Sequence, residues 1–216
     1  MELLIATYNN GKIRELEQAL RGLPITLRYL KDFPIASLVE ETGETYEDNA
    51  VLKALAYSEQ TGLYALADDS GLEVKALNGR PGVRSARFGG ENASDSDRTQ
   101  RLLQELVAYE AGERGARFVC YMAFAATPKP CDFPSAKTQV LNISEGICEG
   151  TIAREPRGAG GFGYDPVFIP TGHEATFGEL SPEIKSVLSH RAKAVSAMRL
   201  FLTQFLRQLD HLPTAT

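Results

Sequence analysis

Cysteine is scarce in this sequence, and both long apolar runs and an excess of positive charge are lacking. The 216 residues include Cys120, Cys131 and Cys148, an odd number with no CxxC spacing and no clustered histidines nearby. Neither a disulfide framework nor a structural zinc site is indicated, and a reducing compartment fits best. The apolar run Leu3 to Ala6 is too short for a signal-peptide core, and no later run approaches a membrane span. We therefore expect a cytoplasmic protein with no membrane partner.

The charge balance is acidic, with 23 Lys and Arg against 28 Asp and Glu and a net charge of −5. Such a chain has no global field to hold a nucleic-acid backbone by counterion release, so no nucleic-acid partner is expected and any phosphate must be held locally. The content of 43% hydrophobic and 24% charged residues is that of an ordinary globular protein. It excludes disorder, collagen and coiled coil, and it predicts one domain or one two-lobed unit over residues 1–216.

Short apolar runs alternate with helix-type spacing, which predicts an α/β fold with a mixed sheet. The predicted strands cover residues 2–6, 25–30, 64–67, 118–126, 138–149 and 166–169. Helices are predicted from 12 to 20, from 46 to 60, from 95 or 96 to 109, from 182, and from 189 to 209. Residues 78–92 and 154–165 are rich in glycine and predict loops, and residues 127–137 form the loop of a predicted antiparallel hairpin.

Several helix starts carry capping signals. Thr45 is followed three residues later by Asp48, which predicts a capped helix that Gly62 ends. Ser181-Pro182-Glu183 predicts a helix with proline at its first position. Ser189 is predicted to cap the last helix, and Asp95 or Ser96 the helix that reaches about residue 109.

The first candidate site is the sequence Thr7-x-Asn9-x-x-Lys12 after the first strand. A strand, a polar turn and a helix bring backbone N–H groups, the positive end of the helix dipole and a lysine to one point, which suits a phosphate or pyrophosphate. The alternative is a plain capped turn between a strand and a helix. The pattern matches neither the Walker A loop nor the dinucleotide glycine fingerprint, so both interpretations stay open.

Two acidic pairs form the second candidate, Glu40-Glu41 and Asp68-Asp69. Adjacent carboxylates offer the hard oxygen ligands that Mg²⁺ accepts while keeping several waters. A solvated acidic loop is the alternative, and we favour it for Glu40. The following Ser70-Gly71 is expected to form a tight turn that directs Asp69 off the end of the predicted strand, where ligands collect in α/β proteins.

Glycines and cations make up the remaining candidates. Residues 158–165 read Gly-Ala-Gly-Gly-Phe-Gly-Tyr-Asp, and an aromatic held among glycines can stack on a base. A flexible loop is the alternative, but it has no need of Phe162 and Tyr164. Lys185 and the sequence Ser189-His190-Arg191 place cations near helix starts, which hints at a bound anion or at base recognition. His173 and His211 are interpreted as surface residues.

These motifs, taken together and in this order, resemble the inosine triphosphate pyrophosphatase family, also called Ham1-like or noncanonical purine NTP pyrophosphatases. The matching blocks are Thr7-x-Asn9-x-x-Lys12-x-x-Glu15, Glu41-Thr42-Gly43, Thr45-Tyr46-Glu47-x-Asn49-Ala50, Ala67-Asp68-Asp69-Ser70-Gly71, Gly160-Gly161-Phe162-Gly163-Tyr164-Asp165 and Ser189-His190-Arg191. The resemblance spans nearly the whole chain. It departs from the family pattern at residues 127–137 and at Arg98, where many relatives have Asn.

The resemblance implies an elongated α/β unit with a central mixed sheet flanked by helices and a nucleotide cleft between two lobes. It implies a homodimer that hydrolyses dITP, ITP and XTP to the monophosphate and pyrophosphate with Mg²⁺, cleansing the nucleotide pool. Asp69 and Lys12 become the catalytic residues, and Glu41 and Asp69 the metal ligands. The implied substrate-binding residues are Thr7, Tyr8, Asn9, Asn10, Gly11, Lys12, Ser70, Phe162, Gly163, Tyr164, Asp165, Lys185, His190 and Arg191.

The residues alone are also compatible with two other functions. One is a Maf-like pyrophosphatase of modified pyrimidine or standard nucleotides, which differs in substrate. The other is a nucleotide-binding sensor without turnover, against which Lys12 and Asp69 argue.

Overall fold

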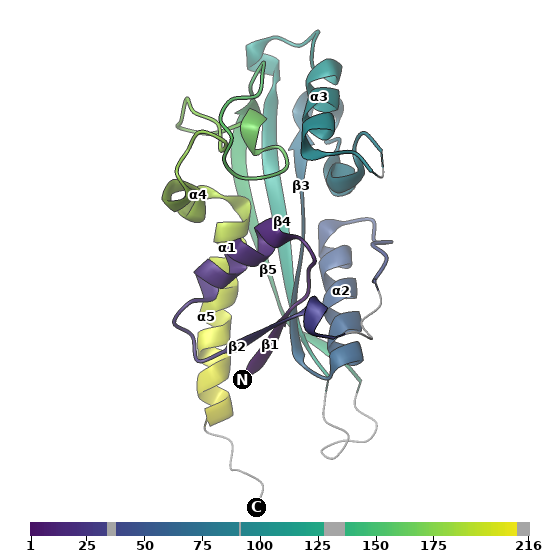
Figure 1. Ribbon diagram of the computed structural model, residues 1–216, viewed down its shortest axis with the longest axis vertical. Helices are drawn as coiled ribbons and strands as arrows, with labels where there is room; N and C mark the ends of the chain where they lie inside the picture. Colours follow the sequence, from purple (N-terminus) through teal and green to yellow (C-terminus); the bar gives the residue numbers. More distant parts are fainter. Residues whose placement is uncertain (34–37, 91, 128–136, 211–216) are drawn as a thin grey trace, which may run out of the picture. The chain divides into compact units, whose positions relative to one another are not determined.

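The computed structural model describes residues 1–33, 38–90, 92–127 and 137–210 (Figure 1). The helices are α1 (Asn10–Leu20), α2 (Tyr46–Thr61), α3 (Asp95–Glu105), α4 (Pro182–Leu188) and α5 (His190–Asp210). The strands are β1 (Glu2–Ile5), β2 (Thr26–Tyr29), β3 (Tyr64–Val74), β4 (Gly115–Ala126), β5 (Gln139–Ile152) and β6 (Phe168–Pro170). The alternation of strands and helices confirms the predicted α/β class.

All six strands belong to one sheet, in the order β2-β1-β3-β4-β5-β6. Strand β1 runs parallel to both neighbours, with Ile5 opposite Tyr29 on β2 and Leu66 on β3. Strands β5 and β6 are antiparallel, with Ile152 opposite Phe168. The sheet is therefore mixed, as predicted.

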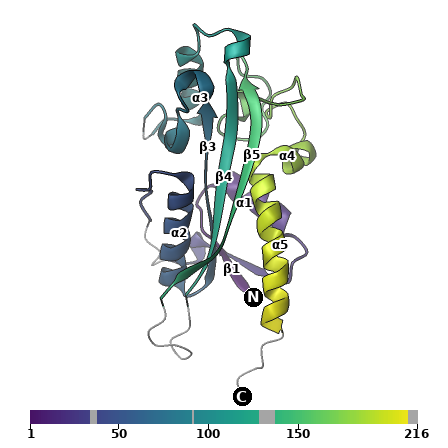
Figure 2. The same cartoon turned by 180° about the vertical axis from the view of Figure 1, so that it is seen from behind.

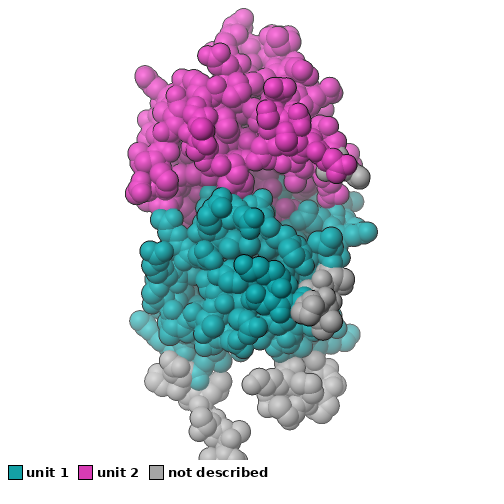
Figure 3. Space-filling model, viewed as in Figure 1, with its two compact units in different colours: residues 1–68, 121–145, 194–216 teal, residues 69–120, 146–193 magenta. Residues whose placement is uncertain are grey.

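The chain forms two compact units, coloured separately in Figure 3. Unit 1 comprises residues 1–68, 121–145 and 194–216, and unit 2 comprises residues 69–120 and 146–193. Each unit is assembled from segments that lie far apart in the sequence. The boundaries fall inside β3, β4, β5 and α5, so these elements contribute residues to both units.

Unit 1 packs helices on two faces of its strands. One core cluster joins Ala50, Ala54 and Tyr57 of α2 to alternate small residues of β3 and β4. On the other face, Phe205 of α5 packs edge-on against Tyr64 and Phe124. Successive residues of a strand point to opposite faces, which explains why Ala65 meets α2 while Tyr64 meets α5. Figure 2 shows α2 and α5 on opposite sides of these strands.

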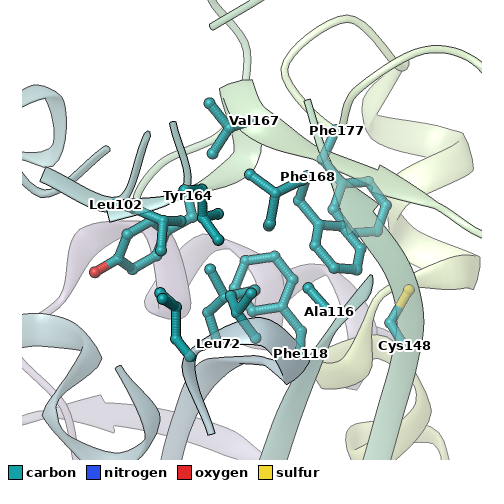
Figure 4. Packing of buried hydrophobic residues seen from close by; sticks show 13 residues of the cluster. Leu72, Leu102, Ala116, Phe118, Cys148, Tyr164, Val167, Phe168 and Phe177 are labelled. Atoms are coloured by element: carbon teal, nitrogen blue, oxygen red, sulfur yellow. The ribbon is translucent and has the colours of Figure 1, made fainter. Parts of the chain in front are cut away.

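Unit 2 has its own hydrophobic core, shown in Figure 4. Its centre is a group of rings, with Phe168 4.6 Å from Phe118 and 5.4 Å from Phe177 between centroids. Leu102 of α3 and Leu72 of β3 are fully buried beside them. This core fixes the strands from which the loops of unit 2 emerge.

Most helix ends follow the predicted capping residues. The Thr45 side chain accepts from the Asp48 N–H, Asp48 caps in return, and Gly62 ends α2 with φ of 68°. Ser181 caps α4 with Pro182 at the first position, and the Ser189 hydroxyl accepts from the Ala192 N–H in the first turn of α5. The prediction for α3 is wrong at both ends: Ser94 is its cap and forms a capping box with Asp97, and the helix ends at Glu105 rather than near residue 109.

Two loop predictions are corrected. Strand β3 continues through Asp68, Asp69, Ser70 and Gly71 to Val74, so the expected strand end and tight turn are absent there. The segment 78–92 is not a plain loop, since residues 82–87 form a 3-10 helix and Pro81 pairs with Glu73 as an isolated bridge. In both segments, sequence of the turn type adopts regular backbone structure, a strand in the first and a short 3-10 helix with one β-bridge in the second.

Some predictions lie outside the described residues. These include most of the loop 127–137, with Cys131, and also His211. His173 is exposed, as predicted. Among the helices that the structure describes, none is both long enough and apolar enough to cross a membrane.

The thiol of Cys148 lies in the core of unit 2, where burial raises its pKa to about 11. The thiolate is the reactive form, so at pH 8 native Cys148 should be alkylated about two orders of magnitude more slowly than in the unfolded chain. Iodoacetamide labelling followed by peptide mass spectrometry, with and without denaturant, measures this ratio. Equal labelling of Cys148 in both states would contradict the burial of this thiol.

Candidate active site

The turn after β1 is ordered by its own side chains. Asn9 caps α1, and its Oδ1 accepts from the N–H groups of Gly11 at 2.8 Å and Lys12 at 3.1 Å. The Thr7 hydroxyl accepts from the Asn9 N–H at 3.2 Å. Tyr8, Asn9 and Asn10 are exposed, and the first turn of α1 has no acidic residue. The turn therefore combines accessible polar groups with an uncompensated positive helix end.

Lys12 points back to β3. Its Nζ lies 3.0 Å from Asp68 Oδ2, with the lysine side chain 14% exposed and that of Asp68 1% exposed. The parallel pairing explains this contact, because Ile5 at the end of β1 lies opposite Leu66, two residues before Asp68. The ammonium group is thus held near the surface by a buried carboxylate.

A second ammonium group reaches Asp68 from α2. Lys53 Nζ donates to the Asp68 carbonyl oxygen at 2.7 Å and to Glu41 Oε1 at 2.5 Å, and the residue is 8% exposed. The sequence interpretation did not include Lys53. Its position three residues after Ala50 and four after Asn49 places it on the buried face of α2, and a lysine on such a face is the signal that could have identified it.

The segment that carries Glu41 is tied to α2. The Asn49 Oδ1 accepts from the Gly43 N–H at 2.8 Å, and the Tyr57 hydroxyl oxygen accepts from the Val39 N–H at 3.2 Å. A Cβ on Gly43 would lie 2.6 Å from the Asp48 Cβ, so only glycine fits here. Glu40 is exposed, which agrees with the interpretation as a solvated residue.

Asp69 and Ser70 are the first two residues of unit 2. Asp69 is 6% exposed, and its Oδ1 accepts from the Ser70 N–H at 2.9 Å. The Ser70 hydroxyl in turn accepts from Arg191 Nη2 at 2.7 Å, and Arg191 is 3% exposed. The structure therefore brings together Ser70 and Arg191, which the sequence had assigned separately.

The glycine-rich loop carries Phe162 between two cations. Lys185 Nζ lies 4.7 Å and the Arg191 guanidinium carbon 5.7 Å from the centre of its ring. Asp165 Oδ2 accepts from the Phe162 N–H at 2.8 Å and from Lys185 Nζ at 2.6 Å. Gly161 has φ of 76°, and a Cβ there would lie 2.0 Å from Asp165 Oδ2. The loop is thus fixed by a buried carboxylate rather than flexible.

His190 and Tyr164 have surroundings that the sequence did not indicate. The His190 ring stacks on Phe118 with centroids 4.6 Å apart and an interplanar angle of 10°. Tyr164 belongs to the core, its hydroxyl donates to the Ser85 carbonyl at 2.9 Å, and burial raises its pKa well above the usual range. Contact between Tyr164 and a substrate would therefore come from its main chain.

The donor chemistry fits a divalent cation with few protein ligands. Asp68 and Asp69 are almost fully buried carboxylates, but as consecutive residues of β3 their side chains point to opposite faces of the strand. Glu41, which pairs with Lys53, is a further hard oxygen donor. Among the described residues no three His, Cys, Asp or Glu side chains cluster as a metal cage. Mg²⁺ is usually bound through one or two carboxylates together with substrate phosphates, and Glu41 and Asp69 are side chains of that type.

Comparison with known proteins gives matches over nearly the whole chain. A family model described as the Ham1 family matches residues 3–201. The chain is 41% identical to a dITP/XTP pyrophosphatase from Coxiella burnetii, covering 94% of this chain and 98% of the relative, and 46% identical to one from Geobacter sulfurreducens, covering 91% and 94%.

Solved structures give the same result. A HAM1 protein from Coxiella burnetii aligns with a TM-score of 0.81 at 42% identity, covering 94% of this chain and 99% of the other. The Ham1 protein of Staphylococcus aureus aligns with a TM-score of 0.79 at 36% identity, with the same coverage. The family model, the full-length relatives and the matching folds converge, and the chain belongs to the Ham1 family.

Proposed function

We propose that this protein hydrolyses dITP, ITP and XTP to the nucleoside monophosphate and pyrophosphate and so removes them from the nucleotide pool. The observation that carries this proposal is the buried Asp68, which holds the ammonium groups of Lys12 and Lys53 and is followed in the chain by the buried carboxylate of Asp69. Buried carboxylates beside lysines provide a proton acceptor and positive charge for phosphoanhydride chemistry. The relatives named as dITP/XTP pyrophosphatases support the same substrates.

In the proposed reaction, water attacks the α-phosphorus and the bond to the bridging oxygen of pyrophosphate breaks. Asp69 orients the water and accepts its proton, because a carboxylate held by the Ser70 N–H has a fixed direction. Lys12 stabilises the negative charge that develops on the departing pyrophosphate. Glu41 and Asp69 are the residues proposed to hold Mg²⁺, which when bound supplies further charge neutralisation for the phosphates.

Phe162 is proposed to stack on the purine base. The cations near Phe162 are proposed to donate hydrogen bonds to the polar atoms at the edge of that base. Hypoxanthine and xanthine carry a keto oxygen at position six, where adenine carries an amino group. Donors of the His190-Arg191 region pair with an oxygen and oppose an amino group, which gives discrimination against adenine. Lys185 is proposed to support the same pocket through its position over Phe162.

A substrate panel with separate detection of pyrophosphate and orthophosphate tests the proposal. The purified protein with Mg²⁺ should release pyrophosphate from ITP, dITP and XTP. Release of orthophosphate alone would refute it. Faster turnover of dUTP, dTTP or dGTP would favour the Maf-like alternative, and calorimetric binding of ITP without hydrolysis would favour the sensor.

Lys12→Met should lower kcat/KM for ITP by about a hundredfold, because it removes the charge that faces the leaving group. Arg14→Met is the matched control, since it removes an exposed cation from the same helix. It should leave kcat/KM within about twofold of wild type, because exposed charges contribute little. Equal losses in the two variants would show that only the net charge of α1 matters.

We also propose that the protein acts as a homodimer in the cytoplasm. The sequence has three cysteines with no CxxC spacing, and Cys120 and Cys148 are buried, in keeping with a reducing compartment. Sedimentation equilibrium at micromolar concentration measures the oligomeric state, and a monomer throughout that range would refute the dimer.

A further inference from the structure

The loop that carries Phe162 is held from two sides in unit 2. One side is Asp165 with Lys185, described above. The other side is the first turn of α3, where Asp95 Oδ2 accepts from the Gly163 N–H at 2.7 Å. The sequence separation of these two residues is large, so only the folded chain brings them together. Gly163 directly follows Phe162, and the planar peptide group between them includes the Phe162 Cα, so this hydrogen bond restrains the backbone from which the ring extends.

Asp95 is itself oriented by a neighbouring cation. Its Oδ1 accepts from Arg98 Nη2, while Arg98 Nη1 donates to the carbonyl oxygens of Ala86 and Ala93, each at 2.8 Å. The Arg98 side chain is only 19% exposed. The Arg98 guanidinium thus links the Ala86 carbonyl, the Ala93 carbonyl just before α3 and the Asp95 carboxylate through hydrogen bonds.

The charge of Asp95 suits this role. Burial acts to raise the pKa of Asp95, but the Gly163 N–H and the Arg98 guanidinium together lower it below its usual value. The group is therefore a carboxylate at neutral pH and acts only as an acceptor. Hydrogen bonds from N–H groups to a charged acceptor are the stronger kind, so Asp95 adds a second restraint to the one that Asp165 places on the loop.

We propose that Asp95 is a positioning residue for substrate recognition: through Gly163 it holds Phe162 in the direction needed to stack on the purine base. This inference rests on the proposed function, because it assigns Phe162 to the base. The hydrogen bonds of Asp95 are with Gly163 and Arg98, and not with Asp69, the proposed metal ligand of unit 2. Loss of Asp95 should therefore affect substrate affinity more than the chemical step.

The test compares Asp95→Ala with Asp95→Asn and Asp97→Ala. Asp95→Ala should raise KM for ITP about tenfold with kcat changed less, as expected for a lost hydrogen bond to a charged group. Asp95→Asn keeps an oxygen that can accept from Gly163 and should recover most of the affinity. Asp97→Ala removes a carboxylate from the same helical turn but only disrupts the cap on Ser94, so KM should match wild type.

Amide hydrogen exchange of Gly163, followed by NMR, gives a readout that does not depend on activity. Exchange should be at least about tenfold faster in Asp95→Ala than in wild type or Asp97→Ala. Unchanged Gly163 exchange, or a KM change equal in Asp95→Ala and Asp97→Ala, would overturn the positioning role. If wild type releases no pyrophosphate from ITP, the proposed function fails, and the exchange data alone then decide whether Asp95 holds the loop.

Discussion

Asp69→Asn is expected to lower kcat for ITP by about three orders of magnitude while KM changes less than about threefold. The substitution keeps the size of the side chain and an oxygen for the Ser70 N–H, so the local backbone stays in place. It removes the negative charge and the ability to accept a proton from water. The loss therefore falls on the chemical step and not on substrate binding.

Steady-state kinetics with pyrophosphate detection measure both constants, and thermal unfolding of the variant checks the fold. Asp32→Asn is a suitable control, because Asp32 is a partly exposed carboxylate that pairs with Arg28 and accepts from the Tyr29 N–H. It should retain wild-type kinetics. A parallel loss of ITP affinity in Asp69→Asn, or a large drop in its thermal stability, would mean that Asp69 is chiefly structural.

Arg114→Met should destabilise the protein by about 3–5 kcal/mol, a large part of the stability of an ordinary domain. The Arg114 guanidinium is buried in unit 2 and donates to three backbone carbonyls, those of Leu106, Ile152 and Ala153, at 2.7–2.9 Å. Burial, and after it the positive charge of nearby Arg154, lowers the pKa of Arg114. The ordinary pKa of arginine is so far above neutral pH that the guanidinium stays charged.

Replacing a buried charged pair with apolar residues can be neutral, because both partners are removed together. That outcome is not available to Arg114, since its partners are main-chain carbonyls that remain after the substitution. The three carbonyls belong to the end of α3 and the end of β5, just before the glycine-rich loop. Their desolvation is then uncompensated, and this term exceeds the gain from burying a methionine.

Urea unfolding at pH 7 measures the difference in free energy of unfolding. Arg117→Met provides the matched control, because Arg117 is close in sequence and forms an exposed ion pair with Glu73. It should change stability by less than about 1 kcal/mol. Arg114→Lys keeps the charge but loses the fork of donors, so it should fall between the two. Equal stabilities for Arg114→Met and Arg117→Met would show that water replaces the guanidinium.

Local sequence predicted those parts of the fold whose stabilising contacts are also local. The capping box of Thr45 and Asp48 and the proline after Ser181 are short-range interactions, and the structure has them where the sequence placed them. The short apolar run of β1 likewise predicted a buried strand, and three of its four residues are buried. These features need no information from distant segments.

The continuation of β3 could not be predicted in this way. Asp-Asp-Ser-Gly is turn-type sequence, but it lies within β3, which pairs with β1 and β4 in the sheet. Its side chains also contact distant segments. Lys12 comes from α1 and Lys53 from α2 to Asp68, and Arg191 comes from α5 to Ser70. The candidate residues were recognised as separate motifs, whereas Lys53 and Asp95 were missed because their roles depend on contacts across long stretches of sequence.

Helices α4 and α5 meet at a single residue. Ser189 ends α4, with its N–H donating to the Lys185 carbonyl, and its hydroxyl and carbonyl begin α5 through Ala192 and Lys193. Only Ser189 separates the two helices, so the junction has no additional residues that could change its length. Lys185 comes from α4 and Arg191 from α5. The short junction therefore sets how the two cations are oriented relative to each other near the Phe162 ring. An insertion of even one residue would turn one cation away from the ring, so this junction should tolerate changes of side chain better than changes of length.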